Sequence, residues 1–167
     1  MPTIYIDMDG VVADWEQLAR QVLGADTLSP EGRWPDKDWA RLKAVEHFYR
    51  ILPKMPMADE MMKMARKFRD HLGWDLYMLT ALPHNDDVPH CAQDKIEWME
   101  EFYPDVKVKF GPYSHDKQKH CKPGDVLVDD RESNIQEWRA AGGHGIKVNK
   151  DYKAALDQLD MLYRKLY

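Results

Sequence analysis

The feature that most constrains the fold is a short apolar run near the N-terminus that ends on two carboxylates. Residues 4–6 are Ile-Tyr-Ile, the composition of a strand buried on both faces. Asp7 and Asp9 follow, and Gly10 comes next, where the chain can turn sharply and direct backbone N–H groups towards an anion. Carboxylates and a glycine turn at the carboxyl end of a buried strand predict a metal and phosphate site.

A second interpretation is that these aspartates only cap the helix that follows. In extended backbone, Asp7 and Asp9 would share one side of the strand, unless the chain is already turning there. Capping needs one short polar side chain just before the first helical turn. Asp14 is better placed for that role, because it directly precedes a helical pattern at residues 15–23.

A second acidic strand end occurs far along the chain. Residues 125–130 read Asp-Val-Leu-Val-Asp-Asp, so an apolar strand again ends on paired carboxylates, Asp129 and Asp130. The two acidic ends meet only if both strands lie adjacent and parallel in one sheet. Alternation of strands and helices predicts that arrangement, an α/β fold with a doubly wound, mostly parallel sheet. The other expected strands are 74–81, 106–110 and 145–148, and the expected helices are 57–72, 92–103, 132–141 and 151–167.

The run of residues 7–14, Asp-Met-Asp-Gly-Val-Val-Ala-Asp, resembles the first motif of the haloacid-dehalogenase-like (HAD) phosphohydrolases. It is most similar to that of the 5'(3')-deoxyribonucleotidases. The resemblance implies a Rossmann-like core, Mg²⁺ as cofactor, Asp7 as the nucleophile that forms an aspartyl-phosphate, and Asp9 as general acid and base. A carboxylate nucleophile divides one difficult hydrolysis into two steps, and Mg²⁺ offsets its repulsion from phosphate. A second carboxyl near a charged neighbour can have a raised pKa, which suits an acid.

The other motifs of this superfamily have counterparts in the same order. Thr80 ends an apolar strand, and the resemblance implies that its hydroxyl and the Ala81 N–H hold the phosphate. Lys95, in an Asp-Lys pair, and Lys117, after Ser-His-Asp, both match a phosphate-binding lysine, and the sequence leaves open which is nearer. Lys95 could otherwise be an ordinary surface lysine. At position 115 histidine stands where relatives carry arginine, so a charge contact there would titrate near neutral pH.

The metal ligands are implied by the same resemblance. Asp129 matches the direct Mg²⁺ ligand of the fourth motif. Asp130 matches a residue that contacts the ion through water or supports the direct ligands without binding the ion itself. With the first motif, the expected metal set is Asp7, Asp9, Asp129 and Asp130.

The stretch between the first helix and residue 57 breaks the α/β pattern. Four prolines and a glycine interrupt residues 25–56, and an insertion here is where the superfamily carries a helical cap. The expected division is a core of 1–14 and 57–167 and a cap of 15–56, with one cap helix at 37–51 whose apolar stripe is packing. Trp15 and Trp34 match the aromatics that hold the base in deoxyribonucleotidases, where stacking contributes about 1 to 3 kcal/mol per base.

Charge and cysteine content limit the partners. The formal net charge of -5 argues against a stable complex with nucleic acid, and the resemblance to the deoxyribonucleotidases implies a small nucleotide as the partner. Two cysteines and no recognisable signal peptide favour a reducing, cytoplasmic compartment, and no apolar run approaches the roughly 20 residues of a membrane span. A zinc site from His90-Cys91 and His120-Cys121 is a weak alternative without a close-spaced ligand pair. A homodimer stays open.

Together these features predict a Mg²⁺-dependent phosphomonoesterase acting on (deoxy)ribonucleoside 5'-monophosphates. One alternative is a phosphatase of the same superfamily acting on another small phosphoester, a sugar phosphate or a polynucleotide 3'-end. The acidic total charge counts against a long nucleic-acid substrate. Another alternative is a catalytically silent nucleotide-binding relative, which would have no need to keep both Asp7 and Asp9.

Overall fold

Five parallel strands form the central sheet in the described part of the computed structural model, which comprises residues 1–24, 35–83 and 88–167. They lie in the order β3-β2-β1-β4-β5, and β1 pairs in parallel with both β2 and β4. The predicted α/β class and the adjacency of the two acidic strand ends are therefore confirmed. The strands are β1 (Thr3–Ile6), β2 (Asp75–Thr80), β3 (Lys107–Phe110), β4 (Val126–Asp129) and β5 (His144–Lys147).

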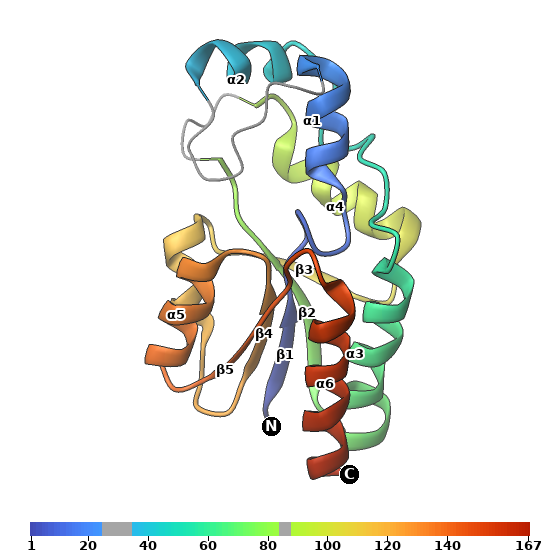
Figure 1. Ribbon diagram of the computed structural model, residues 1–167, viewed down its shortest axis with the longest axis vertical. Coiled ribbons are helices and arrows are strands. Elements are labelled where there is room, and N and C mark those ends of the chain that lie inside the picture. Colours follow the sequence, from blue (N-terminus) through green and yellow to red (C-terminus); the bar gives the residue numbers. More distant parts are fainter. Residues whose placement is uncertain (25–34, 84–87) are drawn as a thin grey trace.

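Helices cover both faces of this sheet (Figure 1). On one face lie α3 (Ala58–Leu72) and α6 (Tyr152–Leu166), which contact each other. On the other lies α5 (Glu132–Ala140), packed against a short 3₁₀ helix, η1 (Ser114–His120). Every residue of β1 and β4 is buried, as the apolar composition of these strands predicts. Fully burying one large apolar side chain stabilises the fold by about 1.5 to 3 kcal/mol.

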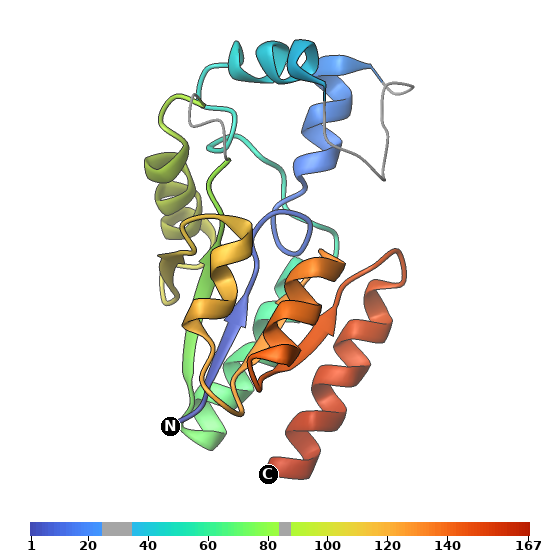
Figure 2. The same cartoon turned by 90° about the vertical axis from the view of Figure 1, so that its left-hand side faces the viewer.

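The remaining helices lie beyond the carboxyl ends of the strands (Figures 1 and 2). They are α1 (Trp15–Leu23), α2 (Asp36–Lys43) and α4 (Cys91–Phe102). The Asp14 carboxylate accepts a hydrogen bond from the Gln17 N–H, which confirms it as the N-cap of α1. No helix of the described ranges combines the length and the apolar composition that crossing a bilayer requires.

Two neighbouring chain segments connect α1 and α2 to the sheet. The Asp14 N–H donates to the Pro53 carbonyl at 2.7 Å, and the Met55 N–H donates to the Val12 carbonyl at 2.8 Å. The segment that leaves β1 and the one that returns before α3 therefore run side by side. This junction supports, as a proposal, the division into a core of 1–14 and 57–167 and a cap of 15–56.

The expected cap helix at 37–51 is wrong in length. The structure has α2 only to Lys43, followed by turns over residues 44–50, where His47 adopts a left-handed backbone with φ 54°. A helix cannot continue through that conformation. The apolar stripe is nevertheless packing, as expected, because Leu42 and Phe48 are 1% and 2% exposed. The apolar residues with helical spacing therefore lie partly in α2 and partly in the turns that follow it, and both parts are buried.

Candidate active site

The first acidic motif turns as soon as β1 ends. The Met8 carbonyl accepts hydrogen bonds from the N–H groups of three successive residues, 11 to 13, so the chain coils tightly after Ile6. The alternation of a strand therefore does not extend to Asp7 and Asp9. Their carboxylates bind different partners and form two halves of one site.

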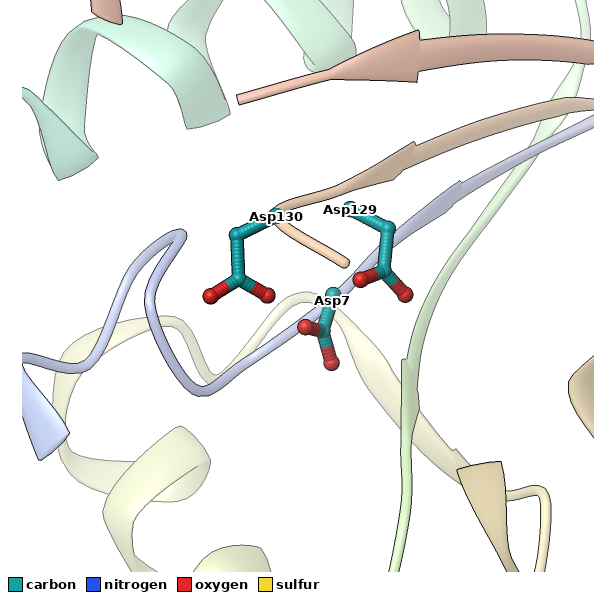
Figure 3. A group of neighbouring side chains, drawn as sticks. All are labelled: Asp7, Asp129 and Asp130. Atoms are coloured by element: carbon teal, nitrogen blue, oxygen red, sulfur yellow. The ribbon is translucent and has the colours of Figure 1, made fainter. Parts of the chain in front are cut away.

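The first half is a cluster of three aspartates. Carboxylate oxygens of Asp7, Asp129 and Asp130 lie within 4.8 Å of one another, and the three carboxyl groups gather at the ends of β1 and β4 (Figure 3). Lys117, from η1, joins two of them: its Nζ donates to Asp7 Oδ1 at 2.7 Å and to Asp129 Oδ2 at 2.8 Å. The lysine is 2% exposed.

The electrostatics of this cluster favour an added cation. Burial and the charge of Asp129 raise the pKa of Asp7 to about 7, against the lowering effect of Lys117. Burial and the charge of Asp7 raise the pKa of Asp130, whose carboxyl faces inward against Gly10 although the residue itself is largely exposed. Burial lowers the pKa of Lys117, but the charges of Asp7 and Asp129 have the larger effect, so the pKa of this lysine is raised. One ammonium thus leaves the three carboxyls incompletely neutralised, and their hard oxygen donors suit Mg²⁺.

Gly10 has a different role from the expected one. Its N–H donates to the Ala13 carbonyl at 2.9 Å, so the expected contact of this N–H with phosphate is not available in the structure. Its φ is 81°, and a Cβ built at this position would overlap the Asp130 carboxylate. Glycine is required here because the turn after β1 passes directly over the tip of β4.

The second half of the site is built around Lys95 of α4. Its Nζ donates to Asp9 Oδ2 at 2.9 Å, to Thr80 Oγ1 at 2.8 Å and to the Ala81 carbonyl at 2.7 Å. Lys95 is 0% exposed, so the surface-lysine interpretation is wrong. β2 supplies Thr80 and Ala81 at the strand end next to Asp7, as the order of the motifs predicts.

The expected metal role of the Asp9 side chain does not fit this arrangement. Its carboxylate bonds to Lys95 and is absent from the metal-ligand group found among the described residues. The other oxygen, Asp9 Oδ1, is buried and has no hydrogen-bond partner in that part of the chain. The two lysines therefore do not compete for one position: Lys117 binds Asp7, and Lys95 binds Asp9.

Several supporting residues were not predicted. Asn134 Nδ2 donates to Asp129 Oδ2 at 3.1 Å, the Arg131 N–H donates to Asp129 Oδ1 at 2.9 Å, and Ser114 Oγ donates to Asn134 Oδ1 at 2.8 Å. A usable signal was present, because a helix that begins directly after an acidic strand end brings its first-turn side chains back over that end. These contacts fix the orientation of the Asp129 carboxylate.

The expected base-binding aromatics are only partly described. Trp15 is half-buried, and its ring lies 5.8 Å from that of Trp39 and 5.9 Å from that of Phe48. Its Nε1–H donates to the Tyr49 hydroxyl at 3.3 Å, and the Tyr49 ring centroid lies 4.8 Å from Lys95 Nζ. Tyr49 was missed, because no local pattern distinguishes it from packing. Trp34 lies outside the described residues.

The zinc alternative has no ligand set in the described ranges. Cys91 is buried and Cys121 partly buried, and neither belongs to the metal-ligand group found there, which is the aspartate cluster. His120 Nε2 instead lies 3.0 Å from the Gly111 carbonyl oxygen.

Comparisons with known proteins agree with this geometry. Residues 1–159 match the model of the family described as "5' nucleotidase, deoxy (Pyrimidine), cytosolic type C protein". A protein of Staphylococcus aureus (strain MSSA476), named "Putative 5'(3')-deoxyribonucleotidase", is 33% identical over 89 residues. That alignment spans 53% of this chain and 44% of the relative, so the chain matches less than half the length of this curated relative.

Solved structures agree on the fold. A crystal structure described as that of a dehalogenase has a TM-score of 0.59 at 13% identity and covers 97% of this chain and 96% of its own. The structure of "a predicted HAD-like family hydrolase" from Porphyromonas gingivalis has a TM-score of 0.50 at 13% identity and covers 95% and 97%. At such low identity these likenesses show the fold alone, which is HAD-like.

Proposed function

This chain belongs to the 5' nucleotidase, deoxy (pyrimidine), cytosolic type C family, and we therefore propose that it is a Mg²⁺-dependent phosphomonoesterase acting on (deoxy)ribonucleoside 5'-monophosphates. The observation that supports this most is the placement of Asp7. It is 6% exposed, lies within reach of Asp129 and Asp130, and bonds to the Lys117 ammonium. A carboxylate held beside positive charge at the carboxyl end of a parallel sheet suits attack on an anionic phosphate.

The two halves of the site divide the proposed chemistry between two carboxyl groups. An Asp7 oxygen forms a bond to phosphorus while the bond from phosphorus to the ester oxygen breaks, and that oxygen takes a proton from Asp9. Asp9 then accepts a proton from water as the water oxygen bonds to phosphorus. The bond between phosphorus and the Asp7 oxygen breaks, which releases phosphate and restores the Asp7 carboxylate. Asp9 Oδ1 suits this proton transfer because it is the oxygen without a partner, while Oδ2 stays bound to Lys95.

Asp7, Asp129 and Asp130 would hold the Mg²⁺ ion in this proposal. When bound, the ion would supply positive charge that offsets the repulsion between Asp7 and the phosphate. Thr80, Ala81, Lys95 and Lys117 are the proposed phosphate-binding residues. Lys95 bonds to Thr80 and Ala81, and Lys117 bonds to Asp7, which supports this role.

The proposal is tested by phosphate release from a panel of substrates, each with Mg²⁺ and with EDTA. The panel comprises deoxyribo- and ribonucleoside 5'-monophosphates, a sugar phosphate, a 3'-phosphorylated oligonucleotide and p-nitrophenyl phosphate. We expect Mg²⁺-dependent release that favours the nucleoside monophosphates and falls to background in EDTA. Preference for the sugar phosphate or the oligonucleotide would support the other phosphatases instead. Silence on every substrate would favour a nucleotide-binding relative.

Base stacking by Trp15 is a separate prediction. Trp15→Ala is expected to raise KM for nucleotides about 5- to 150-fold, because stacking contributes about 1 to 3 kcal/mol. KM for p-nitrophenyl phosphate should change far less, since this substrate carries no base. Steady-state kinetics on both substrates measure the split. Trp74→Ala is the matched control, a half-buried tryptophan packed on Phe68 beside the opposite end of the sheet. Equal weakening of both substrates by Trp15→Ala would rule out stacking.

The other expectations about partners stay predictions. We propose a small nucleotide rather than a nucleic acid as the partner, on the acidic net charge of -5. A reducing, cytoplasmic location is proposed from the sequence alone, and whether the chain forms a homodimer is left open by the sequence.

A further inference from the structure

Two histidines near the Lys95 helix have an unusual backbone. His47 and His90, with φ of 54° and 64°, are the non-glycine residues with positive φ in the described part of the chain. Their rings stack on each other, with centroids 4.6 Å apart and an angle of 25° between planes. Left-handed backbone is unfavourable for residues with a Cβ, and such residues concentrate where the structure constrains a functional group.

One histidine of the pair, His47, contacts a buried carboxylate. Asp94 is 1% exposed, and His47 Nδ1 lies 2.8 Å from Asp94 Oδ1 as its hydrogen-bond donor. Asp94 Oδ2 is buried without a hydrogen-bond partner among the described residues. Burying an incompletely paired carboxylate is unfavourable, so core packing alone gives no reason for an aspartate at this position. The hydrogen bond to Asp94, together with the charge of that carboxylate, in turn raises the pKa of His47.

Residues 47–52, here called the strap, run along α4 and are anchored at other points as well. Arg50 Nη1 donates to Glu101 Oε2 at 2.6 Å, and Trp98 Nε1 donates to the Leu52 carbonyl at 2.8 Å. The Tyr49 ring lies beneath the Lys95 ammonium. These contacts hold the strap on the helix without His47. The contact of His47 with Asp94 is therefore not needed to hold the strap on α4. It lies at the turn of α4 that carries Lys95.

We propose that His47 is a positioning residue that acts through Asp94 to hold the Lys95 ammonium on Asp9 and Thr80. Neighbouring residues of a helix point about 100° apart. Fixing Asp94 toward His47 therefore fixes the direction in which Lys95 leaves α4. The inference rests on the proposed function, because Lys95 matters to turnover only if this site binds a phosphate and Asp9 transfers the proton.

The test is a double-mutant cycle on kcat and KM with a deoxynucleotide and with p-nitrophenyl phosphate. His47→Gly removes the imidazole and tolerates the left-handed backbone, whereas Asp94→Ala removes the buried carboxylate. Each is expected to lower kcat on both substrates about tenfold, the scale for losing a residue that orients a site group, with KM within about twofold. The double variant should be no worse than either single one. His47→Asn should restore kcat, because its amide can donate from the Nδ1 position and asparagine tolerates positive φ.

A matched control is His71→Asn, which alters a histidine whose Nδ1 bonds to the Tyr163 hydroxyl between α3 and α6, away from the site. It should leave kcat unchanged. Unchanged kcat in His47→Gly, or effects of the two single variants that multiply in the double one, would overturn the proposal. So would a His47→Gly chain that fails to fold, since the other strap contacts should hold α4.

A second readout separates this inference from the proposed function. Crystal structures of wild type and His47→Gly, both without metal, should show Lys95 Nζ displaced from Asp9 only in the variant. This measurement does not depend on turnover. An inactive wild type with a displaced lysine in the variant would refute the proposed function and keep the positioning role. An unmoved lysine would refute the positioning role whatever the activity.

Discussion

Asp7→Asn is expected to lower phosphate release by about 10⁴-fold or more, the scale on which loss of a covalent nucleophile acts. The amide has the shape of the carboxyl group and can still accept the Lys117 hydrogen bond, so the fold should persist. It has no anionic oxygen to attack phosphorus. Release of phosphate under saturating substrate and Mg²⁺, with circular dichroism to verify folding, measures this effect. Unchanged turnover would remove Asp7 as the nucleophile.

The same variant should be more stable than wild type in EDTA at alkaline pH. The pKa of Asp7 is raised from 3.8 to about 7 by burial and Asp129, so between these values the folded chain binds more protons than the unfolded chain. Stability is therefore lost as pH rises through this window and stays lost above it. Asparagine does not titrate, and its unfolding free energy at pH 8 should exceed that of wild type by about 1 to 4 kcal/mol, at roughly 1.4 kcal/mol per pKa unit.

Urea unfolding in EDTA at pH 4 and pH 8 checks this linkage. The difference between Asp7→Asn and wild type should be small at pH 4, because this pH lies close to the unfolded-state pKa of 3.8, where the window of lost stability only begins. Asp157→Asn is a control, because its carboxylate makes a single exposed pair with Lys153. A variant that is less stable than wild type at pH 8 would contradict this prediction. It would show that the ion pair between Asp7 and Lys117 stabilises the fold by more than burial of the ionised Asp7 destabilises it.

The parts of the site that could be predicted are those carried by the strands. An apolar run followed by carboxylates specifies a buried strand end, and parallel order brings Asp7, Asp129 and Thr80 to one edge of the sheet. These placements follow from local composition and from topology together. They do not depend on any single side-chain torsion.

What could not be predicted depends on backbone turns. The tight coil around Met8 sends Asp9 to Lys95 and leaves the Gly10 N–H bonded to Ala13. Strand alternation cannot foresee that coil. The choice between the lysines was equally out of reach, because each lies far in sequence from its carboxylate.

The length of the expected cap helix could not be predicted for a related reason. Its apolar stripe predicts burial correctly, but α2 ends at Lys43, and the left-handed backbone of His47 prevents a helix through to residue 51 without glycine or proline to signal it. The contacts of Tyr49 with Trp15 and Lys95 then depend on how the strap meets α4. Such contacts are tertiary and have no local signature.

Removing the positive charge of Lys117 should produce the second large effect. Lys117→Met keeps much of the side-chain volume but leaves the aspartate cluster without its ammonium. Breaking a buried ion pair by removing one partner costs about 3 to 5 kcal/mol, so the metal-free variant should unfold at clearly lower urea concentration. Turnover should fall about 100-fold or more, because a preorganised charge beside the reacting groups is lost. Urea unfolding in EDTA and steady-state kinetics measure the two effects.

Lys95→Met provides the matched control, because both lysines are buried and each is bonded to one carboxylate of the first motif. Lys117 bonds to Asp7 and Asp129 within the metal-ligand group, whereas Lys95 bonds to Asp9 outside it. Mg²⁺ should therefore raise the melting temperature of Lys117→Met by more than that of wild type, since the ion replaces a missing positive charge. Its effect on Lys95→Met should equal that on wild type. A larger response in Lys95→Met would place the metal beside Asp9 and contradict the assignment of the aspartate cluster.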